Sequence, residues 1–149
     1  MILNDDAPLT QRPGATSGGV ATVWFVRTVA GEPQLFAVKR KFQGRRLESS
    51  LQELINGPTD AELKDGVGSE IPRGTVLLGV HREGGAVEVD LSKRFAGGGG
   101  ISSLETRLEQ VARTLKDAET KNDVFLGVEG KRLALLGGEG VEVKQPINK

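Results

Sequence analysis

Few residues in this chain have side chains suited to catalysis or metal binding. His81 is the only histidine among 149 residues, and cysteine is absent from the sequence. A single histidine makes a poor metal site, and without cysteine the chain has no thiol nucleophile, thiolate ligand or disulfide. The sequence also contains neither a Gly-x-Ser-x-Gly elbow nor a His-Glu-x-x-His motif. We therefore predict no catalytic residue, no bound metal and no cofactor, and interpret His81 as a solvated strand residue rather than a general base.

Glu88 and Asp90 are the nearest equivalent of a catalytic carboxylate pair. They alternate with apolar residues between Val87 and Leu91, so a β-strand would place both carboxylates on one face. Such residues could form an acid pair or supply part of a calcium shell, but no Asp-x-Asp-x-Asp-Gly loop accompanies them. Alternating acidic and apolar residues are typical of an antiparallel strand with one face in water. We favour that interpretation.

A run of four glycines, residues 97–100, precedes a predicted helix. Free backbone N–H groups and the helix dipole could bind an anion at this point. The candidate ligand-binding residues are Gly98, Gly99, Gly100, Ser102 and Ser103. However, the lysine of a Walker motif and the glycine spacing of a dinucleotide fingerprint are both missing. A flexible hinge leading into a helix capped by serine is therefore favoured over anion binding.

Charge is balanced over the whole chain but unevenly distributed along it, since 20 basic residues match 20 acidic ones. Residues 27–46 are mainly basic and residues 48–70 mainly acidic. A dipolar surface is predicted, which suits self-association or docking to an anionic partner about as well as it suits a solvated face. The candidates for this interaction surface are Lys39, Arg40, Lys41, Arg45 and Arg46. Because aromatic residues are not interleaved with these cations, nucleic-acid binding is not expected.

The rest of the pattern predicts the elements that position these residues. Residues 1–19 have too few apolar side chains to favour folding, and are predicted to form a disordered tail without a signal peptide or membrane span. Turn residues and apolar spacing then predict, in order, a hairpin of residues 20–29 and 35–42, a helix ending at Gly57-Pro58, a short helix with a capping box from Thr59 to Glu62, and a hairpin of residues 75–82 and 86–91. Within the second hairpin, Val76, Leu78 and Val80 are expected to share one face of their strand.

The clearest predicted element is a helix of residues 102–118. Its apolar residues share one face, and Ser102 to Glu105 has the spacing of a capping box. The apolar stripe consists of Leu104, Leu108, Val111, Ala112, Leu115 and Ala118. Two short strands, residues 124–128 and 132–136, follow. Hairpins that alternate with helices predict an α+β fold, a two-layer sandwich with two helices on one face of a mainly antiparallel sheet.

From residue 47 onward the sequence resembles the GerMN domain, known from sporulation and germination proteins and from bacterial lipoproteins. The resemblance covers about two thirds of the chain in six segments that follow the family's order. They are Leu51–Pro58 with its Gly-Pro end, Ile71–Thr75 with Leu77-Leu78, Val87–Ser92, the glycine run with the helix after it, Val128–Gly130, and Leu136–Gly140. The preceding hairpin is assigned to the same domain, which then spans residues 20–145.

The resemblance implies an extracytoplasmic module with no catalytic centre, similar in fold to the ring-building domains of secretion-like assemblies. The partners it implies are an envelope protein or a second copy of the chain. A binding module for peptidoglycan or another small anionic ligand is the alternative, and a hydrolase is the least favoured. The periplasm or cell envelope is the expected location, with a lipid anchor in a full-length protein. No lipobox cysteine precedes the domain, so a cytoplasmic location is expected if the chain is complete as given.

Overall fold

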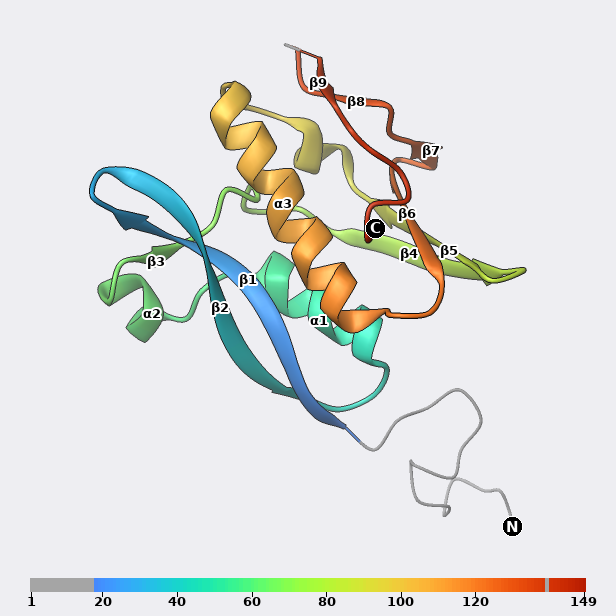
Figure 1. Ribbon diagram of the computed structural model, residues 1–149, viewed down its shortest axis with the longest axis horizontal. Helices are drawn as coiled ribbons and strands as arrows, with labels where there is room; N and C mark the ends of the chain where they lie inside the picture. The colour runs from blue at the N-terminus through green and yellow to red at the C-terminus, as the bar shows by residue number, and fades with distance from the viewer. Residues whose placement is uncertain (1–17, 139) are drawn as a thin grey trace.

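The computed structural model describes residues 18–138 and 140–149. Nearly all of the predicted N-terminal tail, residues 1–19, lies outside this described part of the chain. Figure 1 shows the arrangement of the elements, with the β1–β2 hairpin crossing helices α1 and α3 and the C-terminal strands beside the N-terminal half of α3. None of the helices in the described part is both long enough and apolar enough to cross a membrane.

The chain begins with a long antiparallel hairpin of β1 (Gly19–Val29) and β2 (Glu32–Phe42). The predicted strands end at Val29 and resume at Leu35, but in the structure they extend until only Ala30 and Gly31 remain as the loop. Both residues have positive φ, 52° and 83°. A two-residue loop with positive φ at both positions matches the right-handed twist of the strands, which explains why the pairing continues to the turn.

Two helices follow the hairpin. Helix α1 (Arg46–Asn56) ends at Gly57, which has a φ of 84° that favours glycine, and Pro58 comes next. Helix α2 (Asp60–Lys64) begins with the predicted capping box, in which Thr59 Oγ1 accepts from the Glu62 N–H and the Glu62 carboxylate accepts from the Thr59 N–H. Both predicted helix boundaries are confirmed.

Strand β3 (Val67–Gly68) pairs briefly with β1, and the second hairpin consists of β4 (Leu77–Glu83) and β5 (Ala86–Leu91). Alternation holds in β5, where Val87, Val89 and Leu91 are buried. The alternation predicted for β4 is wrong, because the pairing register shifts between Leu77 and Gly79. Such a bulge reverses the faces on either side of it. As a result Leu78 is exposed, whereas Leu77 and Val80 pack against the core.

After a short 3-10 helix (Lys93–Ala96), helix α3 (Ile101–Ala118) leads to β6 (Asp123–Val128). Strand β6 pairs with β5 in parallel. Parallel strands require a long crossover, and α3 supplies it. Strand β7 (Lys131–Arg132) pairs with β6, and β8 (Leu135–Leu136) pairs with β9 (Val141–Glu142).

The α+β class and the mainly antiparallel pairing are confirmed. Instead of one sheet, the described strands form three, in the orders β2-β1-β3, β4-β5-β6-β7 and β8-β9. A single apolar core nevertheless joins them, with contributions from β1, α1, β5, α3, β6 and the C-terminal segment. Five of the six residues predicted to form the stripe of α3 belong to this core or pack against it: Leu104, Leu108, Val111, Ala112 and Leu115.

Candidate functional site

Arg107, a residue of α3 that is only 3% exposed, binds the backbone of the glycine run before α3. Its Nη1 donates to the carbonyl oxygens of Phe95 and Gly97, at 2.7 and 2.9 Å. Its Nη2 donates to Gly98 O at 3.1 Å, and its Nε donates to Glu70 O at 2.8 Å. Burial lowers the pKa of Arg107 from its ordinary value. Four carbonyl oxygens thus solvate one buried guanidinium, which fixes the start of the loop.

The two serines predicted to bind a ligand have different environments. Ser103 Oγ donates to Glu70 Oε1 at 2.6 Å, whereas Ser102 is exposed. The predicted capping box from Ser102 to Glu105 is wrong, because the N-cap is Gly100 and no side chain caps the helix. Through Ser103, the Glu70 carboxylate lies beside the first turn of α3, where an external anion would be expected to bind. The other three candidates, Gly98 to Gly100, are exposed in the loop.

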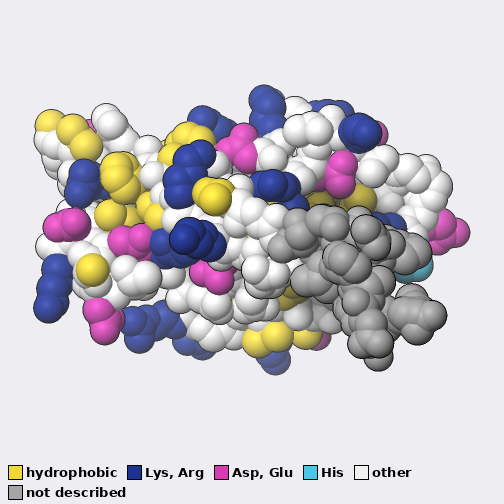
Figure 2. All heavy atoms as spheres, turned by 90° about the horizontal axis from the view of Figure 1, so that it is seen from below, with side chains coloured by type: hydrophobic (Ala, Val, Ile, Leu, Met, Phe, Trp, Pro, Cys, Tyr) yellow, Lys and Arg dark blue, Asp and Glu magenta, His cyan; other side chains and the backbone are white. Residues whose placement is uncertain are grey.

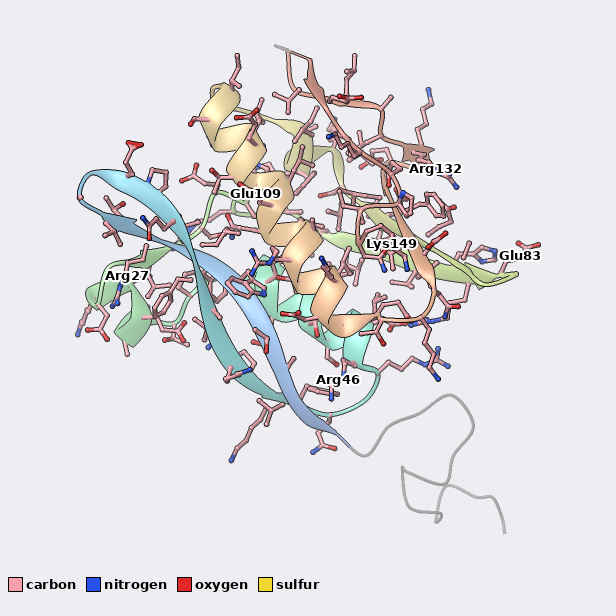
Figure 3. The ribbon with its side chains drawn as sticks, viewed as in Figure 1. Arg27, Arg46, Glu83, Glu109, Arg132 and Lys149 are labelled. Carbon is pink, nitrogen blue, oxygen red and sulfur yellow. The ribbon has the colours of Figure 1, made fainter. Side chains whose placement is uncertain are left out.

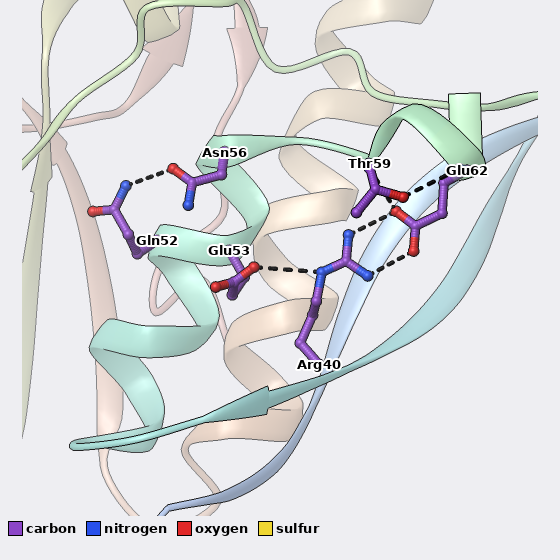
Figure 4. Close-up of polar contacts among 6 residues, drawn as sticks. All are labelled: Arg40, Gln52, Glu53, Asn56, Thr59 and Glu62. Atoms are coloured by element: carbon purple, nitrogen blue, oxygen red, sulfur yellow. Dashed lines mark hydrogen bonds and ion pairs between the residues drawn. The ribbon is translucent and has the colours of Figure 1, made fainter. Parts of the chain in front are cut away.

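The basic and acidic blocks of the sequence meet in the folded protein. Figure 2 shows basic and acidic side chains interspersed over one face of the molecule. At the junction, Arg40 donates from Nη1 and Nη2 to the two carboxylate oxygens of Glu62, both at 2.6 Å, and its Nε lies 3.4 Å from Glu53 Oε1. Figure 4 shows this clamp between β2, α1 and α2. The bidentate bond to Arg40 lowers the pKa of Glu62 to about 2.

Of the other predicted interaction residues, Lys39 and Lys41 lie in β2, and Arg45 and Arg46 lie at the start of α1. Arg46 donates to Val20 O at 2.8 Å and its guanidinium stacks on the Phe42 ring, and Lys39 Nζ donates to Thr22 Oγ1 at 2.7 Å. Lys41 and Arg45 are exposed. Three of the five predicted cations therefore form bonds within the chain. The basic and acidic blocks, which are separate in the sequence, lie next to each other in the fold.

His81, Glu88 and Asp90 line one hollow of about 390 Å³ on the outer face of the four-stranded sheet. His81 Nε2 lies 3.0 Å from Glu83 Oε1, and Asp90 Oδ1 accepts from the Gly130 N–H at 2.8 Å. Glu88 forms an ion pair with Arg132 from β7. The structure thus brings the histidine and both acids together, but without a hydroxyl side chain among the described residues of the lining.

A larger groove, about 750 Å³ in volume, lies between α3 and the C-terminal segment, residues 140–149. Ile101, Leu108 and Ala112 line it from the helix, and Val141, Val143 and Ile147 line it from the segment. Figure 3 labels Glu109 on α3 and Lys149 on the segment, which are both residues of this groove. The groove was not predicted from the sequence. The alternation of Val141 and Val143 signals a strand there, but no sequence pattern signals that this strand returns to α3.

Two further polar residues of α3 were also missed. Gln110 and Thr114 are fully buried. Thr114 Oγ1 accepts from the Trp24 N–H at 3.0 Å, and Gln110 Nε2 donates to Trp24 O at 3.1 Å, so side chains of α3 satisfy the edge of β1 that β3 leaves unpaired. The spacing of Arg107, Gln110 and Thr114, three and four residues apart, places all three on one face of the helix and is the signal that could have revealed them.

Comparison with known structures identifies the fold. The first GerMN domain of the sporulation protein GerM from Bacillus subtilis matches with a TM-score of 0.61 at 16% identity, over 85% of this chain and 95% of that chain. The tandem GerMN domains of the same protein match with a TM-score of 0.63 at 17% identity, over 87% of this chain and 45% of that chain. This chain therefore spans less than half the length of the tandem protein.

A protein described as a lipoprotein from Clostridium perfringens also matches, with a TM-score of 0.53 at 20% identity over 81% of each chain. Comparison with curated proteins finds no match. A family model named Germane and described as "Sporulation and spore germination" matches residues 16–134, which is most of the chain and includes β1 to β7. The chain thus belongs to the Germane family, and it has the fold of the GerMN domains.

Proposed function

We propose that this domain is a non-catalytic module of the bacterial cell envelope whose task is to bind another protein. The observation that carries the proposal is the groove between α3 and the C-terminal segment. Six of its twelve lining residues are apolar, and two exposed large apolar side chains lie at it: Ile101, 50% exposed, lines it, and Leu135, 60% exposed, lies next to Gly140, which also lines it. Apolar surface left in water at a concave site is typical of an interaction site.

The alternative of a hydrolase has less support. Catalysis of hydrolysis requires a nucleophile or an activated water within hydrogen-bond reach of a base. In the hollow that contains His81, the acids are occupied by Arg132 and by the Gly130 N–H, and the described lining offers no hydroxyl. These contacts support a structural role for Glu88 and Asp90, because they join β5 to β7 and to the turn before it.

A ligand site for cell-wall glycan at residues 98–103 has less support as well. Arg107 draws the carbonyl oxygens of Gly97 and Gly98 inward, and Ser103 is occupied by Glu70. Titration of the protein with peptidoglycan fragments, followed through the backbone amide signals of residues 98–103, tests this alternative directly. We expect these signals to stay unchanged.

An envelope location is proposed from the relatives, since one similar structure is described as a lipoprotein and two come from a sporulation protein. The decisive experiment is cross-linking of the tagged domain in an intact envelope fraction of the bacterium that produces it, combined with light scattering of the purified domain. We expect one defined protein to be cross-linked in a stoichiometric amount. A domain that stays monomeric and captures nothing more than an unrelated domain of the same net charge would contradict the proposal.

A further inference from the structure

The groove between α3 and the C-terminal segment is preformed, because its C-terminal wall is fixed to β6. The Ile147 N–H donates to Val124 O at 2.7 Å, and Asn148 Oδ1 accepts from the Val124 N–H at 2.9 Å. The Gln145 amide donates to Leu126 O at 2.8 Å and accepts from the Leu126 N–H at 3.0 Å. Such bonds fix the wall to β6, which shares the apolar core with α3. A ligand of the groove therefore meets two rigid walls and loses little free energy to their ordering.

The helical wall places acidic residues beside the apolar lining. Ile101, Glu105, Leu108 and Ala112 recur at intervals of three and four residues, so they share one face of α3, with Glu109 at its margin. Leu108 is buried, whereas Glu105 and Glu109 are exposed and lie one turn apart. Two like charges at this spacing repel each other slightly and so destabilise the helix itself.

The three carboxylates of this groove are not neutralised within the described part of the chain. Glu105, Glu109 and Glu142 line the groove, and their carboxylates form no hydrogen bond or ion pair with a described residue. Most other described carboxylates are bound internally, as those of Glu48, Glu53, Glu62, Glu70, Glu88, Asp90, Asp117 and Glu129 are. Two lysines, Lys144 and Lys149, also line the groove, and Lys149 Nζ lies 3.6 Å from Asp123 Oδ1, so the charged lining has three carboxylates against two ammonium groups.

We propose that this groove binds a short amphipathic segment of a partner protein that presents Lys or Arg beside Leu, Ile or Val side chains. The apolar lining takes the aliphatic side chains, and Glu105, Glu109 and Glu142 take the basic ones. The inference rests on the proposed function and names the chemistry of the partner. A groove of about 750 Å³ has room for several side chains. The apolar surface supplies affinity, and the carboxylates select the partner by charge.

The test uses a designed peptide of about four helical turns with Leu and Lys on one face. Its affinity is measured by titration calorimetry with the full chain, and its position by backbone amide shifts. The test variant is Glu105→Lys/Glu109→Lys. Its matched control is Glu32→Lys/Asp65→Lys, which makes the same charge change at two exposed acids outside the groove. Lysine is as good a helix former as glutamate, so α3 should fold in the test variant.

We expect the peptide to shift amide signals of α3 and of residues 141–147. The test variant should bind about ten-fold more weakly, and the control within about two-fold of the parent, because exposed charges away from the groove contribute little. A peptide with Ser in place of Leu should lose most of its affinity, since the apolar contacts are gone. Equal weakening in both variants, or shifts outside the groove, would mean non-specific charge attraction and would overturn the inference.

Two further outcomes separate this inference from the proposed function. Self-association of the chain that disappears in Glu105→Lys/Glu109→Lys would place a second copy in the groove and overturn the assignment to a different partner. Envelope cross-linking that persists unchanged in this variant would leave the proposed function intact and overturn the groove as the binding site. If neither the parent nor the variant captures a protein, the proposed function itself fails.

Discussion

At the scale of single residues, charged side chains in this domain mainly join elements. Arg40 connects β2 to α1 and α2 through Glu53 and Glu62, and Arg82 Nη1 and Nη2 connect β4 to α1 through the carboxylate oxygens of Glu48, at 2.7 and 2.8 Å. The bond to Arg82 also lowers the pKa of Glu48. Bidentate pairs with a half-buried partner are stronger than ordinary surface ion pairs. These residues therefore belong to the fold and are poor candidates for binding a partner.

The Arg40–Glu62 pair gives a prediction about acid stability. The pKa of Glu62 is about 2 in the folded protein, below its ordinary value of 4.5. The pair thus contributes its full stability above about pH 4.5 and loses it as the pH falls toward 2. Glu62→Gln should lower the free energy of unfolding by about 1–2 kcal/mol at pH 7, because Glu62 is 22% exposed and partly screened by solvent. Urea unfolding measured from pH 7 to pH 2 should show this difference shrinking with acid.

The control for this measurement is Glu32→Gln, the same chemical change at an exposed acid near the turn of the first hairpin. Its stability should stay within about 0.5 kcal/mol of the parent at every pH. A difference between Glu62→Gln and the parent that is constant from pH 7 to pH 2 would show that the charge of Glu62 has no part in its effect.

At the scale of elements, α3 contributes to the apolar core and also covers one edge of strand β1. Pairing with β3 uses only Val26 and Arg27 of β1, so the backbone groups of Trp24 would be left without partners on that edge. Thr114 and Gln110 supply those partners. Arg113 stacks on the Trp24 ring, and Asp117 Oδ2 accepts from Trp24 Nε1 at 2.8 Å. About two turns of the helix, residues 110–117, thus contact a single residue of β1.

Because α3 covers the edge of β1 at Trp24, removal of the Thr114 hydroxyl should destabilise the protein. Thr114→Val keeps the shape of the side chain but leaves the Trp24 N–H without an acceptor. A buried donor without a partner costs about 1–3 kcal/mol, so the free energy of unfolding should fall by that amount. Thr106→Val is the matched control, because Thr106 lies on the same helix and its hydroxyl forms no side-chain bond with a described residue. Chemical unfolding followed by circular dichroism measures both, and equal stability of the two variants would contradict this role of α3.

The elements also show how far the sequence predicts this fold. The end of α1 at Gly57 and the capping box at Thr59 are local features that the sequence predicted correctly, whereas the capping box predicted at Ser102 is wrong. The bulge in β4 was not predicted, because it depends on the register against β5 rather than on the strand's own pattern. The hydrophobic stripe of α3 predicted which residues are buried against the core. It did not predict Arg107, Gln110 and Thr114, since the burial of polar residues depends on backbone groups brought near by the tertiary fold.

At the scale of the whole molecule, one core connects sheets that do not pair with one another. Val23 and Phe25 of β1 share this core with Val87 of β5 and with Ile147, close to the C-terminus. The parallel pairing of β5 with β6 follows from chain direction, because α3 returns the chain to the same end of the sheet. Neither this pairing nor the groove follows from local pattern, since both bring together segments far apart in the chain. Residue patterns predicted the α+β class and the order of the elements, and the family resemblance predicted the GerMN fold itself.

Because the core is shared, a destabilising substitution near the C-terminus should also lower the stability of the first hairpin. Asn148 is only 4% exposed, and its side chain accepts from the Val124 N–H and donates to the carbonyl oxygens of Glu119 and Asn122. Asn148→Ala leaves these backbone groups buried without partners, which should cost about 2–4 kcal/mol. Trp24, the only tryptophan of the chain, lies in β1 and reports on the hairpin by its fluorescence.

If the core is one cooperative unit, Asn148→Ala must lower the midpoint of the Trp24 fluorescence transition and of the far-UV circular dichroism transition by the same amount, as two-state unfolding requires. Lys149→Ala is a suitable control, since Lys149 is exposed and forms a weak ion pair that contributes little to stability. A variant in which the C-terminal segment detaches while the Trp24 transition keeps its midpoint would show that the segment is a separate unit. The groove would then have a wall that opens independently of the core, and the rigid docking geometry would be lost.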